Sequence, residues 1–217
     1  MYALLKVSRG LGGFADMVGR LACWLFIPMM VVITYDITQR KILTWYPEFQ
    51  SSSLYETFPS TKLQESEWHL HAFLFLLCLG YTYVRNGHVR VELIRERMKP
   101  RTRAWIELLG CLLFLLPYCA MVVYFAWGQL IFSYNINESS SATVGLPYRW
   151  IVKGGLVAGF LILAIAGISV LLKHVVYLFG PPELKAATGD FVEVSEIEHL
   201  KKDVAAELSH KKSGGEG

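Results

Sequence analysis

Two pairs of oppositely charged side chains are the first candidates for chemistry in this sequence of 217 residues. Asp16 and Arg20 are four positions apart, as are Asp36 and Arg40, so each pair would lie on one face of a helix. Both pairs flank the apolar block Leu21–Tyr35. We expect ion pairs at the two ends of a membrane-spanning helix, each with little net effect on stability.

Histidines could bind a haem if two of them met at the same depth from different helices. His69 and His71 would lie about 200° apart around one helix, so they cannot share a ligand. His88 and His174 are expected on the other side of the membrane, among interfacial charges. A membrane anchor subunit of a respiratory redox enzyme is therefore only the alternative function.

The cysteines have no C-x-x-C or metal-ligand spacing. They fall within apolar stretches, where a thiol usually packs as a small hydrophobic group; they are Cys23, Cys78, Cys111 and Cys119. We recognise no nucleophile with a base, no phosphate-binding loop and no metal cluster in the sequence. The chain is therefore expected to be no enzyme and to carry no cofactor.

Composition accounts for this scarcity of reactive groups. The chain is 53% hydrophobic and 18% charged, with a mean hydropathy of +0.38, whereas an ordinary soluble domain is roughly 25% charged. Leu108 to Asn137 contains no charged residue over 30 positions, and Gly154 to Leu172 contains none over 19. These values exclude a nucleic-acid-binding domain, a disordered chain and a disulfide-rich module. They predict an integral membrane protein.

Four segments are predicted to span the membrane, since a bilayer core of about 30 Å takes roughly 20 helical residues. In a membrane domain of residues 1–182, the predicted spans are 19–38, 67–85, 104–135 and 149–178. We expect a kink at Pro28 in the first span, and Ser66 is placed to cap the second. The pair Gly155-x-x-x-Gly159 indicates close helix packing. The predicted fold class is all-α, an integral membrane four-helix bundle.

Lysine and arginine residues predict the orientation of the spans, because cytoplasmic loops carry the excess of both. Near the membrane, the N-terminal segment, the loop 85–103 and the start of the tail carry twelve of them, and the other two loops carry five. Both termini are therefore expected on the cytoplasmic side.

The segments outside the spans have features of their own. In the loop 85–103, Val91, Ile94 and Met98 share one helical face, which is typical of a short interfacial helix. Its basic residues are expected either to anchor it on anionic lipid or to form a docking surface for another subunit. Residues 183–217 are expected to form a cytoplasmic tail with an amphipathic helix that a capping box opens at Ser195. The aromatic loop 39–66 is expected either to fold on the outer membrane surface or to meet a partner.

Ionisable residues are missing from the middles of the four predicted spans. Carriers and proton pumps usually place such residues near the bilayer midplane, where ions and substrates need partners. The chain is therefore expected to be an accessory subunit without an active centre. A free-standing homo-oligomer with four spans is a further alternative.

The second span and the loop after it resemble a known family. The run that begins Glu67-Trp68-His-Leu-His and ends Gly87-His88-Val-Arg90-Val-Glu-Leu-Ile is similar to the small permease subunit (DctQ type) of tripartite ATP-independent periplasmic, or TRAP, transporters. The resemblance covers residues 15–180 and is closest to the mannitol/chloroaromatic-type branch. Supporting matches are Tyr35-Asp36 with Arg40, Pro100 to Gly110, and Glu138 to Pro147.

This resemblance implies a scaffold subunit in the bacterial inner membrane. Its implied partners are a large permease subunit (DctM type) and a periplasmic solute-binding protein, which together perform sodium-coupled uptake of an organic acid or related solute. Arg149 and Lys153, with the outer loops, are expected to dock the binding protein. The residues expected at partner or lipid interfaces are Asp36, Arg40, Glu67, Trp68, Gly87, His88, Arg90, Arg95, Arg97, Arg149 and Lys153.

Overall fold

The structure is a computed structural model that describes residues 1–87, 98–182, 184 and 188. Every regular element in those residues is helical, which confirms the predicted all-α class. The predicted interfacial helix of the loop 85–103 and the predicted tail helix fall on residues outside that description. The elements are α1 (Tyr2–Cys23), α2 (Phe26–Trp45), the 3₁₀ helix η1 (Pro47–Ser51), α3 (Ser53–Thr57), α4 (Ser60–Val84), α6 (Pro100–Gly110), the π-helical turn η2 (Cys111–Leu115), α7 (Leu116–Asn135) and α8 (Trp150–Phe179).

Three helical stretches in the described residues are long and apolar enough to cross a membrane: Tyr2–Trp45, Pro100–Asn135 and Trp150–Phe179. The predicted second span is also helical and lies in α4, which has 25 residues. The first half of α4 carries Glu67 and two histidines, so its composition is more polar than that of the other three.

Together, α1 and α2 form a nearly continuous helix of 44 residues with a break at Trp24 and Leu25. The break lies one turn before Pro28, which has no N–H for the Trp24 carbonyl and whose ring crowds that carbonyl. The Trp24 carbonyl instead accepts a hydrogen bond from the Ile27 N–H at 3.2 Å. The predicted kink is present, and Pro28 causes it from the turn that follows.

A second proline widens the helix formed by α6, η2 and α7. Pro117 lies in the first turn of α7, directly after the π-helical turn η2. Because Pro117 cannot donate to the Leu113 carbonyl and would crowd it, the wider turn makes room for the ring. The chain continues as one long helical stretch, Pro100–Asn135, through this point.

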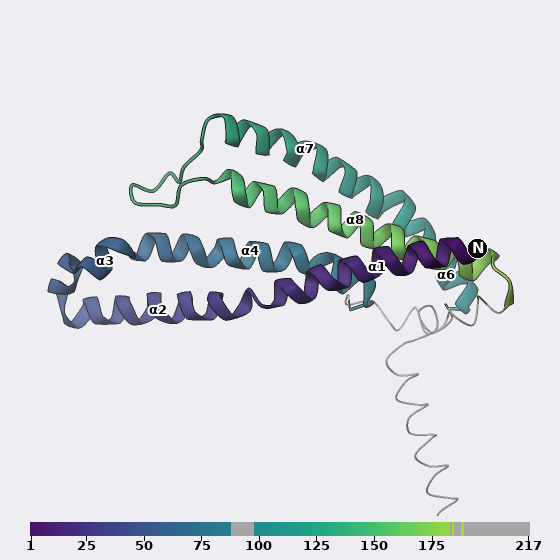
Figure 1. Ribbon diagram of the computed structural model, residues 1–217, viewed down its shortest axis with the longest axis horizontal. Coiled ribbons are helices and arrows are strands. Elements are labelled where there is room, and N and C mark those ends of the chain that lie inside the picture. The colour runs from purple at the N-terminus through teal and green to yellow at the C-terminus, as the bar shows by residue number, and fades with distance from the viewer. Residues whose placement is uncertain (88–97, 183, 185–187, 189–217) are drawn as a thin grey trace, which may run out of the picture.

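The predicted aromatic loop 39–66 is largely helical. α2 continues to Trp45, η1 and α3 reverse the chain, and α4 begins directly after Pro59. The prediction that Ser66 caps a helix is wrong, since Ser66 lies inside α4 and donates to the Lys62 carbonyl at 2.8 Å. We call residues 36–67 the arm; in Figure 1 it extends past the start of α8 at the end of the molecule farthest from the N-terminus.

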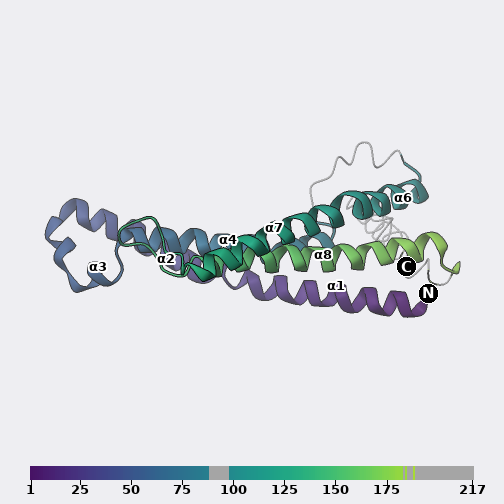
Figure 2. The ribbon, with the colours of Figure 1, turned by 90° about the horizontal axis from the view of Figure 1, so that it is seen from above.

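The helices form an open layer in which α8 is central. α8 packs against α4, α7 and α1, whereas α7 packs mainly against α8, and α2 packs mainly against α4 (Figures 1 and 2). The predicted four-helix architecture is therefore present, but without a closed core. Such openness is acceptable in a bilayer, because lipid tails cover apolar side chains as well as another helix does.

The seam between α4 and α8 is a close helix contact, and glycines make it possible. A Cβ atom on Gly159 would lie 2.7 Å from Leu76 Cβ and 2.9 Å from the Leu76 carbonyl oxygen. A Cβ atom on Gly80 would lie 2.8 Å from Ile162 Cγ2, and one on Gly155 would overlap a phenyl ring of α4. The close packing predicted from Gly155 and Gly159 is therefore present.

A pair of serines joins α1 to α8. The Ser8 hydroxyl donates to the Ser169 carbonyl at 2.7 Å, and the Ser169 hydroxyl donates to the Ser8 carbonyl at 2.8 Å. Leu5 packs against Val176 near the end of α8, and Ala15 packs farther along the same helix. The first helix therefore runs beside α8 from its first turns, well before residue 19, where the first span was predicted to begin.

Candidate functional site

Asp36 is the most deeply buried of the predicted interface residues that the structure describes, with 1% of its surface exposed. Its carboxylate accepts hydrogen bonds from the Arg40 guanidinium and, at 2.5 Å, from the hydroxyl of Ser60 at the start of α4. A buried carboxylate requires such partners. The predicted Asp36–Arg40 pair is present, and it also joins the two helices of the arm, which the sequence did not predict.

Gln39 makes a second contact from the same face of α2. Its side-chain amide is buried and donates to the Phe58 carbonyl at 3.1 Å, at the end of α3. Sequence reasoning missed Gln39. Its only local signal is the three-residue spacing from Asp36, which places both side chains on the face toward α4. Asp36 and Gln39 together hold the arm closed.

Glu67 approaches this cluster from α4. With Asp36 and Arg40 it lines a cavity of about 590 Å³ on the side of the arm. Its Oε1 is buried and has no hydrogen-bond partner among the residues that the structure describes. Trp68, the next residue, is exposed, and its ring centroid lies 5.7 Å from that of His69. The structure thus brings three predicted interface residues together and leaves Trp68 on the outside of α4.

A second polar contact attaches the loop between α7 and α8 to α4. The Glu65 carboxylate accepts hydrogen bonds from the Ser140 hydroxyl and, at 2.5 Å, from the Leu146 N–H. Burial alone would raise the pKa of Glu65, but these two hydrogen bonds and the nearby Arg149 lower it below its ordinary value. Glu65 is therefore charged at neutral pH and fixes the loop.

Arg149 and Lys153, predicted to dock a partner, both have an intramolecular counter-ion. The Lys153 ammonium donates to Glu138 Oε2 at 2.5 Å, and Arg149 Nη1 lies 4.0 Å from Glu138 Oε1. The hydrogen bond from Lys153 is the main cause of the lowered pKa of Glu138. Both cations organise the loop before α8 and remain partly exposed, so their role in docking stays a prediction.

The opposite end of the layer carries another charged cluster. Asp16 accepts hydrogen bonds from Arg20 Nε at 2.7 Å and from Arg85 Nε at 2.6 Å. The Asp16–Arg20 pair was predicted; Arg85 comes from α4 and was not. Gly87 follows and is exposed. The remaining predicted interface residues lie outside the described residues; they are His88, Arg90, Arg95 and Arg97.

The histidines and cysteines show mainly packing contacts. His174 was expected among interfacial charges, but it is 3% exposed because α1 covers this part of α8, and its Nδ1 lies 2.8 Å from a carbonyl of its own helix. The Cys23 and Cys78 sulfur atoms lie 4.0 Å apart, and Cys111 and Cys119 are buried. Within residues 1–87 and 98–182, no three His, Cys, Asp or Glu side chains are grouped to hold a metal ion.

A protein-family model described as "Tripartite ATP-independent periplasmic transporters, DctQ component" matches residues 29–176. The matched range includes the arm and the attached loop, and it ends in the last turns of α8, whereas α1 precedes it. The comparison with curated proteins gives no match, and neither does the comparison with solved structures.

Proposed function

Since the chain belongs to the DctQ family of tripartite ATP-independent periplasmic transporters and is the small inner-membrane component of such a system, we propose that it acts as a fixed scaffold for a large permease subunit of the DctM type. That subunit would carry out sodium-coupled uptake of an organic acid or related solute, delivered by a periplasmic solute-binding protein. Because the family is a transporter component, transport is preferred over a respiratory anchor.

The observation that carries this proposal is the uncovered face of α7. Tyr124 in α7 and Phe114 in the preceding turn η2 are 76% and 75% exposed, and a Cβ atom on Gly128 would meet nothing within 4 Å. Gln129 beside it is also exposed. A small residue beside side chains that can form hydrogen bonds is the pattern with which membrane helices receive another helix. We assign this face to the large permease.

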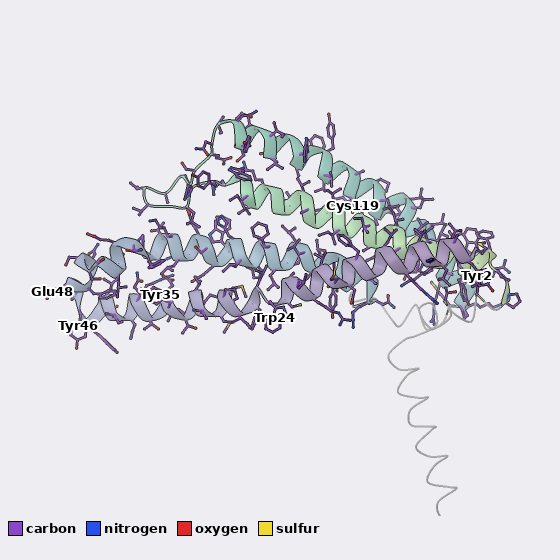
Figure 3. The ribbon with its side chains drawn as sticks, in the orientation of Figure 1. Tyr2, Trp24, Tyr35, Tyr46, Glu48 and Cys119 are labelled. Atoms are coloured by element: carbon purple, nitrogen blue, oxygen red, sulfur yellow. The ribbon has the colours of Figure 1, made fainter. Side chains whose placement is uncertain are left out.

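The end of the arm supports a role for the opposite region in docking the solute-binding protein. Trp45, Tyr46 and Leu54 are exposed there, and Figure 3 places Tyr46 and Glu48 at the far end of the arm. Exposed aromatic residues outside the hydrocarbon layer mark interaction surfaces. Together with Arg149 and Lys153, they would form the platform for the binding protein.

Co-purification tests the proposed scaffold role. The tagged chain is co-expressed with the large permease and the binding protein, and the expected result is a stable complex with the large permease. Gly128→Leu should remove most of the co-purified permease, because a bulky side chain then fills the helix-docking face. Gly13→Leu is the matched control, since Gly13 also meets nothing within 4 Å but lies on α1. If the wild-type chain purifies without the large permease, the scaffold role is wrong. If both variants lose equal amounts of co-purified permease, the α7 face is not the docking face.

A further inference from the structure

Two thiols from different helices meet beside the break between α1 and α2. The Cys23 and Cys78 sulfur atoms lie 4.0 Å apart, although the two residues are 55 positions apart in the chain. Cys23 is the last residue of α1 and is exposed, whereas Cys78 lies inside α4 and is half-buried. The two thiols are therefore close enough to react with each other, and Cys23 is the more accessible of them.

The backbones of α1 and α4 approach closely at this point. Gly19 lies one turn before Cys23, and a Cβ atom on Gly19 would lie 2.1 Å from the Cβ atom of Tyr81, which follows Cys78 on α4. The Cys78 thiol also donates to the Gly19 carbonyl at 3.7 Å. A disulfide joins cysteines whose Cα atoms are about 4.4–6.8 Å apart. Helices that approach this closely can meet that requirement, so the sulfur atoms can bond with little movement of the backbone.

The helix end that carries Cys23 can adjust further. Trp24 and Leu25 interrupt the helix, and their N–H groups donate to carbonyls three residues back at 3.2 and 2.9 Å. A helix end of this kind is less constrained than the middle of a helix. The torsions around Cys23 therefore have the freedom that formation of a bond to Cys78 requires.

The surroundings of Cys23 select the kind of oxidant that can reach it. Cys23 lies in the apolar stretch Tyr2–Trp45, which is long enough to cross a membrane, and its neighbours Leu21 and Trp24 are largely exposed. A reagent that reaches the thiols through lipid has to be uncharged, because burying a charge in hydrocarbon is costly. Organic hydroperoxides are uncharged and accept two electrons, the number that two thiols release when they form a disulfide.

We propose that Cys23 and Cys78 are an oxidative modification site at which an organic hydroperoxide forms a disulfide between α1 and α4. In the first step, the Cys23 sulfur attacks the O–O bond and keeps one oxygen as a sulfenic acid, while the thiol proton leaves with the alcohol. In the second step, the Cys78 sulfur attacks the Cys23 sulfur, the S–O bond breaks, and hydroxide leaves with the Cys78 proton as water. Two thiols lose two electrons, and one hydroperoxide becomes one alcohol and one water. The proposal does not rest on the scaffold role.

The disulfide closes a loop that contains the whole arm. Residues 36–67 lie between the two cysteines in the chain, and α2 packs mainly against α4. A cross-link removes the conformations in which its two ends separate. The oxidised chain therefore keeps the base of the arm attached to α4 even when the polar contacts of Asp36 and Gln39 are lost.

Counting the free thiols of the full-length chain tests the site. The protein in lipid vesicles is treated with cumene hydroperoxide, denatured and alkylated with N-ethylmaleimide. The chain has four cysteines, so the oxidised wild type should take up two maleimide groups and the reduced protein four. Proteolysis should release one disulfide-linked pair of peptides, which contains Cys23 and Cys78. Four alkylated thiols after oxidation, a linked pair of other cysteines, or disulfide-linked dimers of the chain would overturn the proposal.

Two variants assign the roles of the thiols. Cys78→Ser should form no disulfide and should instead gain oxygen at Cys23, because the sulfenic acid then has no second thiol to attack it. Cys119→Ser is the matched control, since Cys119 is a buried cysteine of α7, and this variant should form the disulfide as the wild type does. Equal loss of the disulfide in the two variants would overturn the assignment of the pair. A Cys78→Ser chain without added oxygen at Cys23 would overturn the order of the two steps.

Discussion

The α4–α8 seam and the arm hold helices together with different groups. At the seam, Gly80 and Gly159 allow the two backbones to approach, and the contact consists of hydrocarbon against backbone. In the arm, the buried Asp36 joins α2 to Ser60 of α4, and the buried Gln39 joins α2 to the Phe58 carbonyl at the end of α3. Both contacts involve α4, within some 25 residues of each other.

The difference corresponds to the surroundings expected for each region. Between helices in lipid there is little hydrophobic driving force, so close packing of small residues holds the seam. The arm extends past the start of α8 (Figure 1), outside the segments expected in the hydrocarbon layer, where water competes for hydrogen bonds. The Asp36 carboxylate and the Gln39 amide N–H stabilise it because they form hydrogen bonds in a buried position.

The largest effect is expected from filling the seam. Gly159→Leu should destabilise the chain by about 3 kcal/mol, since the new side chain meets both Leu76 Cβ and the Leu76 backbone. Reversible unfolding in mixed micelles measures the change. Gly128→Leu on the open face of α7 is the matched control and should be nearly neutral in the isolated chain. A similar decrease in the free energy of unfolding of both variants would mean that the α4–α8 seam is not a close contact.

A smaller and local effect is expected from opening the arm. Asp36→Ala removes the acceptor of Arg40 and Ser60 and should cost about 1–2 kcal/mol, because the Ser60 hydroxyl loses its acceptor while Arg40, 52% exposed, regains water. Amide hydrogen exchange should become faster in η1 and α3 and stay unchanged at the seam. Asp36→Asn, which keeps one acceptor, should show a weaker effect. Uniformly faster exchange would contradict separate stabilisation of the two regions.

The loop between α7 and α8 should respond to pH through Glu65. The pKa of Glu65 in the folded protein lies below its ordinary value of 4.5, so its contribution is complete above pH 4.5 and is lost as the pH falls through the lowered pKa. The loop should then exchange amide hydrogens faster, by an amount that matches about 1 kcal/mol. The Glu65→Gln variant should lack this pH dependence. A wild-type loop with unchanged protection under acid would argue against the Glu65 contact.

The smallest effect is expected at Asp16. Asp16→Asn weakens two ion pairs whose arginines are largely exposed, and such pairs contribute little because water and salt screen them. Unfolding in mixed micelles should differ from the wild type by less than the Asp36→Ala change. A loss of stability as large as that of Gly159→Leu would show that this cluster contributes as much between α1 and α4 as the glycine seam does between α4 and α8.

Predictions that depended on neighbours in the chain were successful at the site. Four-residue spacing predicted the pairs of Asp16 with Arg20 and Asp36 with Arg40, and both form. Partners from distant segments were missed, as with Arg85 on Asp16, because local spacing carries no information about which helices meet. The Ser66 cap failed for a related reason: the helix begins earlier, where Pro59 and the contact of Ser60 with α2 set its start.

By itself, the sequence determined the class of the protein and its helices. Hydropathy and charge decide whether a segment can lie in lipid, and helix formation there satisfies the backbone without help from other segments. Only the tertiary structure decided how the helices align, that their layer is open, and that an aromatic loop forms a helical arm closed by buried polar contacts. Those features depend on contacts such as Gly159 with Leu76 and Asp36 with Ser60, in which side-chain size and burial are set jointly by residues far apart in the chain.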